Sequence, residues 1–180
     1  MSDDLIHRIV EEIEYLRAKR AWTVRARPRL IVVHGHHKAL RDCSPGETIE
    51  QASFSVRSRL TRLRVSPTGL VLLDVLARKR PQPLTAGQIE RVVSSNPFYL
   101  GLGANANSTQ WPRIGLNRRT IKVYIPRLHR QIGKALKEAG LAMRPEEVLL
   151  TEDTELLNVK AYRLAIPCQF VHLGGARARK

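Results

Sequence analysis

Residues 117–137 carry a pattern that strongly limits how this chain can fold. Apolar side chains recur there at intervals of three and four residues, which places them on one face of an α-helix. They are Ile121, Ile125, Leu128 and Ile132. The same segment holds seven Lys or Arg residues and no Asp or Glu. The pattern predicts a helix that reaches Glu138, with an apolar face in the core and a cationic surface outside.

Folding alone does not explain the charge of this helix. Exposed helices usually mix charges, because opposite charges four residues apart are stabilising and like charges are destabilising. We therefore interpret the surface as one that contacts phosphates, with a solvated basic face as the alternative. Arg127 suits the O6 and N7 atoms of guanine, whereas Lys134 and Lys137 suit phosphates. Pro126 is expected to kink or restart the helix, and the sequence leaves both outcomes open.

The whole chain of 180 residues shares this bias, with 31 Lys or Arg, 16 Asp or Glu and a net charge of +15. Residues 1–14 hold one basic and five acidic residues, so residues 15–180 hold 30 basic and 11 acidic residues, a net charge of +19. Such an excess favours nucleic acid as the partner, ahead of an anionic membrane surface or an acidic protein.

The sequence argues against secreted and membrane-spanning classes. Cys43 and Cys168 are the only cysteines, too few for a disulfide framework. No segment approaches the roughly 18 apolar residues of a membrane span. The first residues, MSDDLIHR, are acidic where a signal peptide is basic. We expect a cytoplasmic protein that does not contact a membrane.

The first third of the chain is predicted to form one helix and two strands. Residues 3–20 have the apolar spacing of an amphipathic helix, which packs on its own domain or forms a short dimer contact. Residues 26–35 form a strand candidate. Residues 54–65 alternate like a half-buried strand, with Phe54, Val56 and Leu60 on one face and Arg57, Arg59 and Thr61 on the other.

Three helices and a hairpin are predicted in the rest of the chain. Ser66 is a suitable N-cap for a helix with Pro67 in its first turn. Thr85 and Gln88 form a capping box for the next helix. A long loop over residues 95–117 then leads to the basic helix. Two apolar runs separated by a polar turn, Val148–Thr151 and Val159–Ile166, predict a hairpin.

This order of elements predicts an α+β fold of the winged helix-turn-helix type. It would have N-terminal strands, a three-helix core and a C-terminal β-hairpin wing, with the third helix in the major groove of DNA. We divide the chain into an N-terminal amphipathic helix (1–25), a winged-helix DNA-binding domain (26–168) and a basic flexible tail (169–180).

Four segments in this order resemble the OmpR/PhoB-type winged-helix transcription regulators. "RRTIKVYIPRLHRQI" resembles the recognition helix of that family, in register without a gap. "VSPTGLVLLDVLARK" and "LTAGQIERVV" are similar to its first and second helices, and "VKAYRLA" to the end of its wing. The similarity covers about residues 30–166. Gly69, Lys122, Pro126 and Ala161 depart from the family pattern.

The resemblance implies a small N-terminal antiparallel sheet and a wing that reaches the minor groove. It also implies a transcription regulator that binds double-stranded DNA in a sequence-specific way, in the bacterial cytoplasm or nucleoid. It also implies a homodimer on direct repeats and a contact with RNA polymerase, or with another protein, through the 95–117 loop. Because only about 30 residues precede the first strand, we expect no control by a fused phosphorylated receiver. Together with the charge pattern, the resemblance gives these DNA-contacting residues: Arg118, Arg119, Thr120, Lys122, Val123, Tyr124, Arg127, His129, Arg130, Lys134 and Lys160.

Other functions have weaker support in the sequence. His34, His36, His37 and Cys43 resemble a metal-ligand cluster, but no Cys-x-x-Cys or second His cluster accompanies them. No pair of carboxylates placed to hold two metal ions is evident, so we expect neither an enzyme nor a cofactor. The main alternative is a structural protein that coats RNA or DNA without reading its sequence. A third interpretation is an interaction module whose basic face binds an acidic protein.

Overall fold

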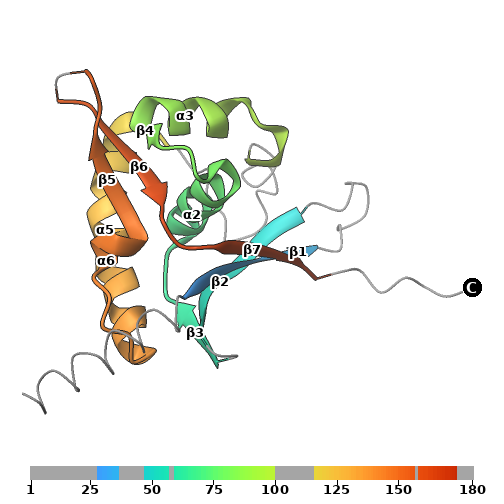
Figure 1. Ribbon diagram of the computed structural model, residues 1–180. Coiled ribbons are helices and arrows are strands. Elements are labelled where there is room, and N and C mark those ends of the chain that lie inside the picture. The colour runs from blue at the N-terminus through green and yellow to red at the C-terminus, as the bar shows by residue number, and fades with distance from the viewer. Residues whose placement is uncertain (1–27, 37–46, 57–58, 100–115, 157, 174–180) are drawn as a thin grey trace, which may run out of the picture.

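The described part of the chain has an α+β fold of two small sheets and three longer helices (Figure 1). The computed structural model describes residues 28–36, 47–56, 59–99, 116–156 and 158–173. The predicted helix 1–25, the 100–115 part of the long loop and the end of the predicted tail lie outside these residues.

The first sheet has four strands in the order β3-β2-β1-β7. Its strands are β1 (Arg29–His36), β2 (Glu47–Val56), β3 (Arg59–Leu63) and β7 (Cys168–His172). β1 pairs antiparallel with β2, and β2 pairs antiparallel with β3. β7 pairs parallel with β1, so the last described strand of the chain joins the first one.

The prediction of a single strand over residues 54–65 is wrong. β2 ends at Val56 and β3 begins at Arg59, and the two strands pair antiparallel with Ser55 opposite Leu60. Phe54 is buried, with 1% of its surface exposed, whereas Leu60, predicted for the same face, is 61% exposed. A two-residue alternation looks the same on both sides of a short turn, so the pattern did not mark the reversal.

The predicted boundary of the tail at residue 169 is also wrong. Residues 168–172 form β7, and the Leu30 N–H donates a hydrogen bond of 2.8 Å to the Pro167 carbonyl. The first sheet is therefore neither wholly N-terminal nor wholly antiparallel. Pairing between segments so distant in sequence leaves no local signal, because each strand stabilises the other only after the chain has folded back.

Helix α2 (Pro67–Lys79) is the centre of the core. As predicted, the Ser66 hydroxyl accepts a hydrogen bond from the Gly69 N–H, and Pro67 occupies the first turn. Every residue from 69 to 77 is buried. The reason is visible in Figure 1, where α2 lies between the first sheet and the later hairpin and contacts β2 on one side.

The second sheet and the remaining helices follow α2. Strand β4 (Leu84–Thr85) leads into α3 (Ala86–Ser95), where Thr85 and Gln88 form the predicted capping box. Helix α5 (Arg118–Glu138) and the short α6 (Pro145–Val148) precede β5 (Leu149–Asp153) and β6 (Lys160–Leu164). β5 and β6 form the predicted antiparallel hairpin, and β4 adds a third strand in the order β4-β6-β5.

A buried carboxylate connects three segments of the fold through hydrogen bonds. Asp74, on α2, is 0% exposed. It accepts hydrogen bonds from Tyr99 Oη (2.6 Å), Arg78 Nε (2.9 Å) and His34 Nε2 (2.8 Å). Burial alone would raise the pKa of Asp74, but the hydrogen bonds from His34, Tyr99 and Arg78 outweigh it and hold the pKa below its ordinary value of 3.8. The ionised carboxylate thereby links β1, α2 and the segment after α3.

We predict that D74N lowers the free energy of unfolding by about 3 kcal/mol, because it removes the buried counter-charge of Arg78 and the carboxylate acceptor of His34. Y99F removes one donor and keeps the carboxylate paired, so its cost should be smaller, about 1.5 kcal/mol. Because the folded pKa of Asp74 is lowered, its contribution is present above the ordinary value and disappears as the pH falls through the folded value. Urea unfolding between pH 2 and 7 should reveal an acid-sensitive component that D74N lacks; equal pH profiles would contradict this.

Candidate nucleic-acid interface

Helix α5 has two sharply different faces. Its predicted apolar stripe is buried: Ile121 and Ile132 are 0% exposed and Leu128 is 2% exposed. Close contact with α2 is made through Gly69, where an added Cβ would lie 3.1 Å from the Val65 Cβ and 3.3 Å from a methyl carbon of Leu128. With that stripe held in the core, the basic side chains of the helix project into solvent.

The start of α5 is fixed by a local cap. The Asn117 side chain accepts hydrogen bonds from the Thr120 N–H (2.8 Å) and the Thr120 hydroxyl (2.9 Å). The backbone donor at the first turn is thereby satisfied. Thr120, predicted as a DNA contact, has its hydroxyl proton directed to Asn117, so its first role is to define where the helix begins.

Helix α5 runs through Pro126 as one element of 21 residues. It does not restart there, which excludes one of the two outcomes that the sequence left open. On a continuous helix, residues three and four apart share a face. One exposed face therefore carries five cations, here called the cationic ridge: Arg119, Arg127, Arg130, Lys134 and Lys137.

The cationic ridge has no compensating acids. Within the described residues, none of its five members forms an ion pair. Val123, 49% exposed, lies between Arg119 and Arg127, one turn from each. The Arg127 guanidinium lies 5.1 Å from the centre of the Tyr124 ring, a cation–π contact that orients it without neutralising it. The ridge thus combines oriented positive charge with one exposed apolar side chain. Lys122, also predicted as a contact, is exposed beside it.

Two of the predicted contact residues also make contacts within the fold. Arg118 Nε donates to Glu90 Oε2 at 3.2 Å, an ion pair that connects α5 to α3. His129 Nε2 lies 2.7 Å from the Leu149 carbonyl oxygen and so attaches α5 to β5. Their partners are 28 and 20 residues away in sequence, which is why the helix pattern alone could not separate them from the ridge.

The hairpin of β5 and β6 does not extend the positive surface. Lys160, the predicted contact on the wing, forms an ion pair with Asp153 across the hairpin, and Arg163 pairs with Glu152. Residues 149–164 hold two basic and three acidic residues. Attraction to phosphate is therefore concentrated on α5 and not on the hairpin.

Sequence analysis missed a second set of cations next to α5. Arg59, Arg62 and Arg64 lie on or just after β3, and all three are exposed. Of these three, the sequence pattern assigned only Arg59 to the outer face of a strand, together with Arg57 and Thr61. The sequence does not indicate that these arginines lie near the end of α5, because that proximity results from the packing of β3 on α5.

The histidine cluster is divided by the structure. His34 is buried and bonded to Asp74, whereas residues 37–46 lie outside the described part of the chain. Across the described ranges, no group of three or more His, Cys, Asp or Glu residues is placed to hold a metal ion.

Also within those ranges, no helix is both long and apolar enough to cross a membrane. The 95–117 loop remains a prediction as a protein contact, since most of it is not described.

Comparison of the chain with protein-family models, curated proteins and solved structures finds no match.

We predict that P126A stabilises the protein, because alanine supplies the N–H that proline cannot donate to the Lys122 carbonyl. An interior proline costs a helix about 3 kcal/mol, so a gain of about 1–3 kcal/mol is expected in the free energy of unfolding, measured with urea. P67A is the matched control: Pro67 lies in the first turn, where no helical hydrogen bond is lost, and its replacement should give no gain. Equal effects of both changes would contradict the expectation.

Proposed function

We propose that this protein is a winged helix-turn-helix transcription regulator of the OmpR/PhoB type, which binds double-stranded DNA through α5. The observation that carries the proposal is the cationic ridge, which is exposed, continuous through Pro126 and free of ion pairs among the described residues. The order of α2, α3 and α5 followed by the β5–β6 hairpin supports the same proposal.

The first half of the exposed face of α5 has the chemistry for reading bases. Arg119 and Arg127 are four residues either side of Val123. Guanidinium groups bond guanine O6 and N7, and an apolar side chain contacts the methyl group of thymine. We assign these three residues to the bases in the major groove. Lys134 lies two turns further along and is assigned to phosphates, which fix position and carry no sequence information.

A protein that coats nucleic acid without reading its sequence would use the same positive charge. The two functions differ in whether binding depends on the DNA sequence. The test is selection of bound fragments from a random duplex pool at about 0.15 M salt with excess competitor DNA. The proposal expects a recovered sequence motif, with a direct repeat if two copies bind side by side. Recovery of no motif, with binding that disappears as salt rises, would refute it and favour coating.

We predict that two substitutions on the cationic ridge affect DNA binding in different ways. R127A should cost about 1–3 kcal/mol on the selected sequence and relax the preference at one base position. K134A should weaken binding to all sequences alike and reduce the dependence of log K on log salt by about one unit. Fluorescence anisotropy on the selected duplex and on single-base variants measures both. Identical losses for the two variants on every duplex would contradict the assignment of Arg127 to a base.

A further inference from the structure

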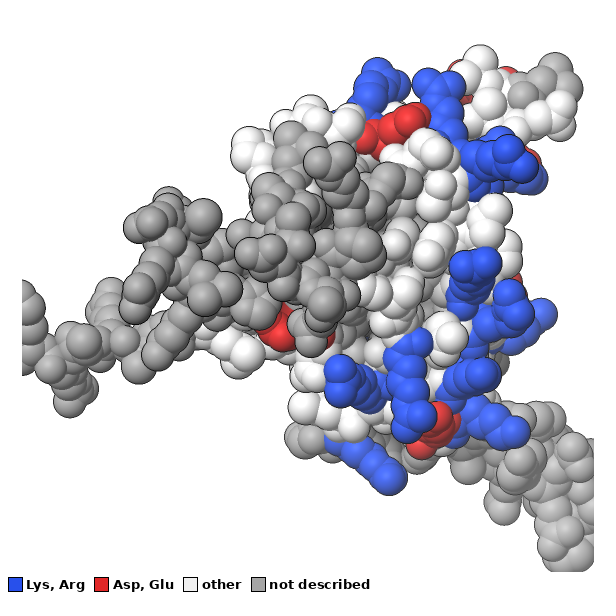
Figure 2. All heavy atoms as spheres, turned by 180° about the vertical axis from the view of Figure 1, so that it is seen from behind, with Lys and Arg blue, Asp and Glu red and all other residues white. Residues whose placement is uncertain are grey.

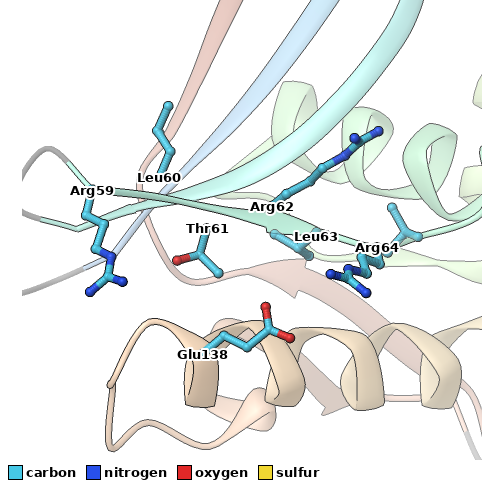
Figure 3. A pocket seen from close by; sticks show the side chains of 8 residues that line it. Arg59, Leu60, Thr61, Arg62, Leu63, Arg64 and Glu138 are labelled. Atoms are coloured by element: carbon cyan, nitrogen blue, oxygen red, sulfur yellow. The ribbon is translucent and has the colours of Figure 1, made fainter.

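A groove opens between β3 and the last turn of α5 (Figure 3). Its volume is about 900 Å³, and its polar lining consists of Arg59, Thr61, Arg62, Arg64 and Glu138. We call it the arginine groove. β3 is at the edge of the first sheet, so no other described strand pairs with one side of its backbone.

The charges of the arginine groove are left uncompensated. Arg59, Arg62 and Arg64 are exposed, and none of them forms an ion pair within the described residues. Glu138 is the one acid in the lining, and it lies beyond ion-pair distance of the three guanidinium groups. Charges on an edge strand also discourage pairing with other strands. That role explains charges at the edge, but it does not require a hollow facing the basic end of a helix.

The groove continues the cationic ridge. Lys134 and Lys137 occupy the turns of α5 that lead to Glu138. In Figure 2, Lys and Arg side chains gather over one side of the molecule, where α5 and β3 lie. A helix of 21 residues is about 31 Å long, whereas the major groove is about 12 Å wide. If the first half of α5 lies in the groove, its C-terminal end and β3 therefore extend over the sugar–phosphate backbone.

We propose that the arginine groove binds the phosphate backbone of the same duplex, next to the base pairs that α5 contacts. Guanidinium groups form paired hydrogen bonds with phosphate oxygens, and the Thr61 hydroxyl is a further donor. The groove lining has no aromatic residue on which single-stranded bases would stack, which favours a duplex. This inference rests on the proposed function and adds a second contact that holds the DNA without reading it.

The test compares R59Q/R62Q with R29Q/K79Q, a control that removes the same charge from exposed residues outside the ridge and the groove. Binding is measured by anisotropy across a salt series, on the selected duplex alone and on the same duplex extended by about ten base pairs at each end. The wild type and the control should bind the extended duplex more tightly than the short one. R59Q/R62Q should lose this gain and about 1.8 units of the salt slope, 0.9 for each phosphate contact, with base preference unchanged.

A variant that is expected to tighten DNA binding distinguishes an effect of charge from an effect of misfolding. E138Q removes the one acid of the groove lining and should tighten binding to the extended duplex several-fold, which a damaged fold would not do. An unchanged salt slope and length dependence in R59Q/R62Q would overturn the inference, as would equal losses in R29Q/K79Q. If R127A still relaxes base preference in that case, the proposed function stands without the groove. If R59Q/R62Q instead abolishes self-association seen by sedimentation of the DNA-free protein, the groove is a protein contact and the inference fails.

Discussion

Burial of the apolar stripe of α5 determines where every charge on that helix is placed. Each fully buried Ile or Leu side chain contributes about 1.5–3 kcal/mol. The like-charged neighbours of the cationic ridge, such as Arg130 and Lys134, repel by only about 0.2–0.5 kcal/mol per pair. The stripe therefore outweighs the repulsion several-fold. The fold tolerates a row of unpaired cations at small cost, and these cations remain available for an anionic partner.

Four acids of the described chain connect elements of the fold. Asp74 joins α2 to β1, and Glu90 joins α3 to α5. Glu152 and Asp153 each form an ion pair with a basic residue across the hairpin. The same compensation is missing on the cationic ridge and in the arginine groove. Positive charge is thus not spread evenly over a basic protein. Among the described residues, several paired cations lie where elements meet, whereas the ridge and the groove together gather eight cations without an ion pair, an arrangement that favours binding of a polyanion.

Features with a local cause could be predicted from the sequence, and features with a distant cause could not. The Ser66 cap, the Thr85–Gln88 box and the buried stripe of α5 each depend on residues within a few turns of one another. The pairing of β7 with β1, the reversal after Val56 and the three partners of Asp74 depend on long-range packing. The candidate site divides in the same way. Periodicity predicted which face of α5 is exposed, but it could not indicate the contacts of Arg118 with Glu90 and of His129 with Leu149, or the arginines of β3 near the end of the helix.

Under the proposed function, the residues of α5 that recognise bases and those that bind phosphates lie in different halves of the helix. Arg119, Val123 and Arg127 present two guanidinium groups around one apolar side chain, a combination that distinguishes bases and has no special value against phosphate. Beyond Arg127 the cationic ridge continues with Arg130, Lys134 and Lys137, and three arginines on or just after β3 lie near its end. The hairpin has no free positive charge to compete with them. The strongest attraction to DNA therefore lies at the C-terminal end of α5, so charge orients the helix on the duplex while its first half selects the sequence.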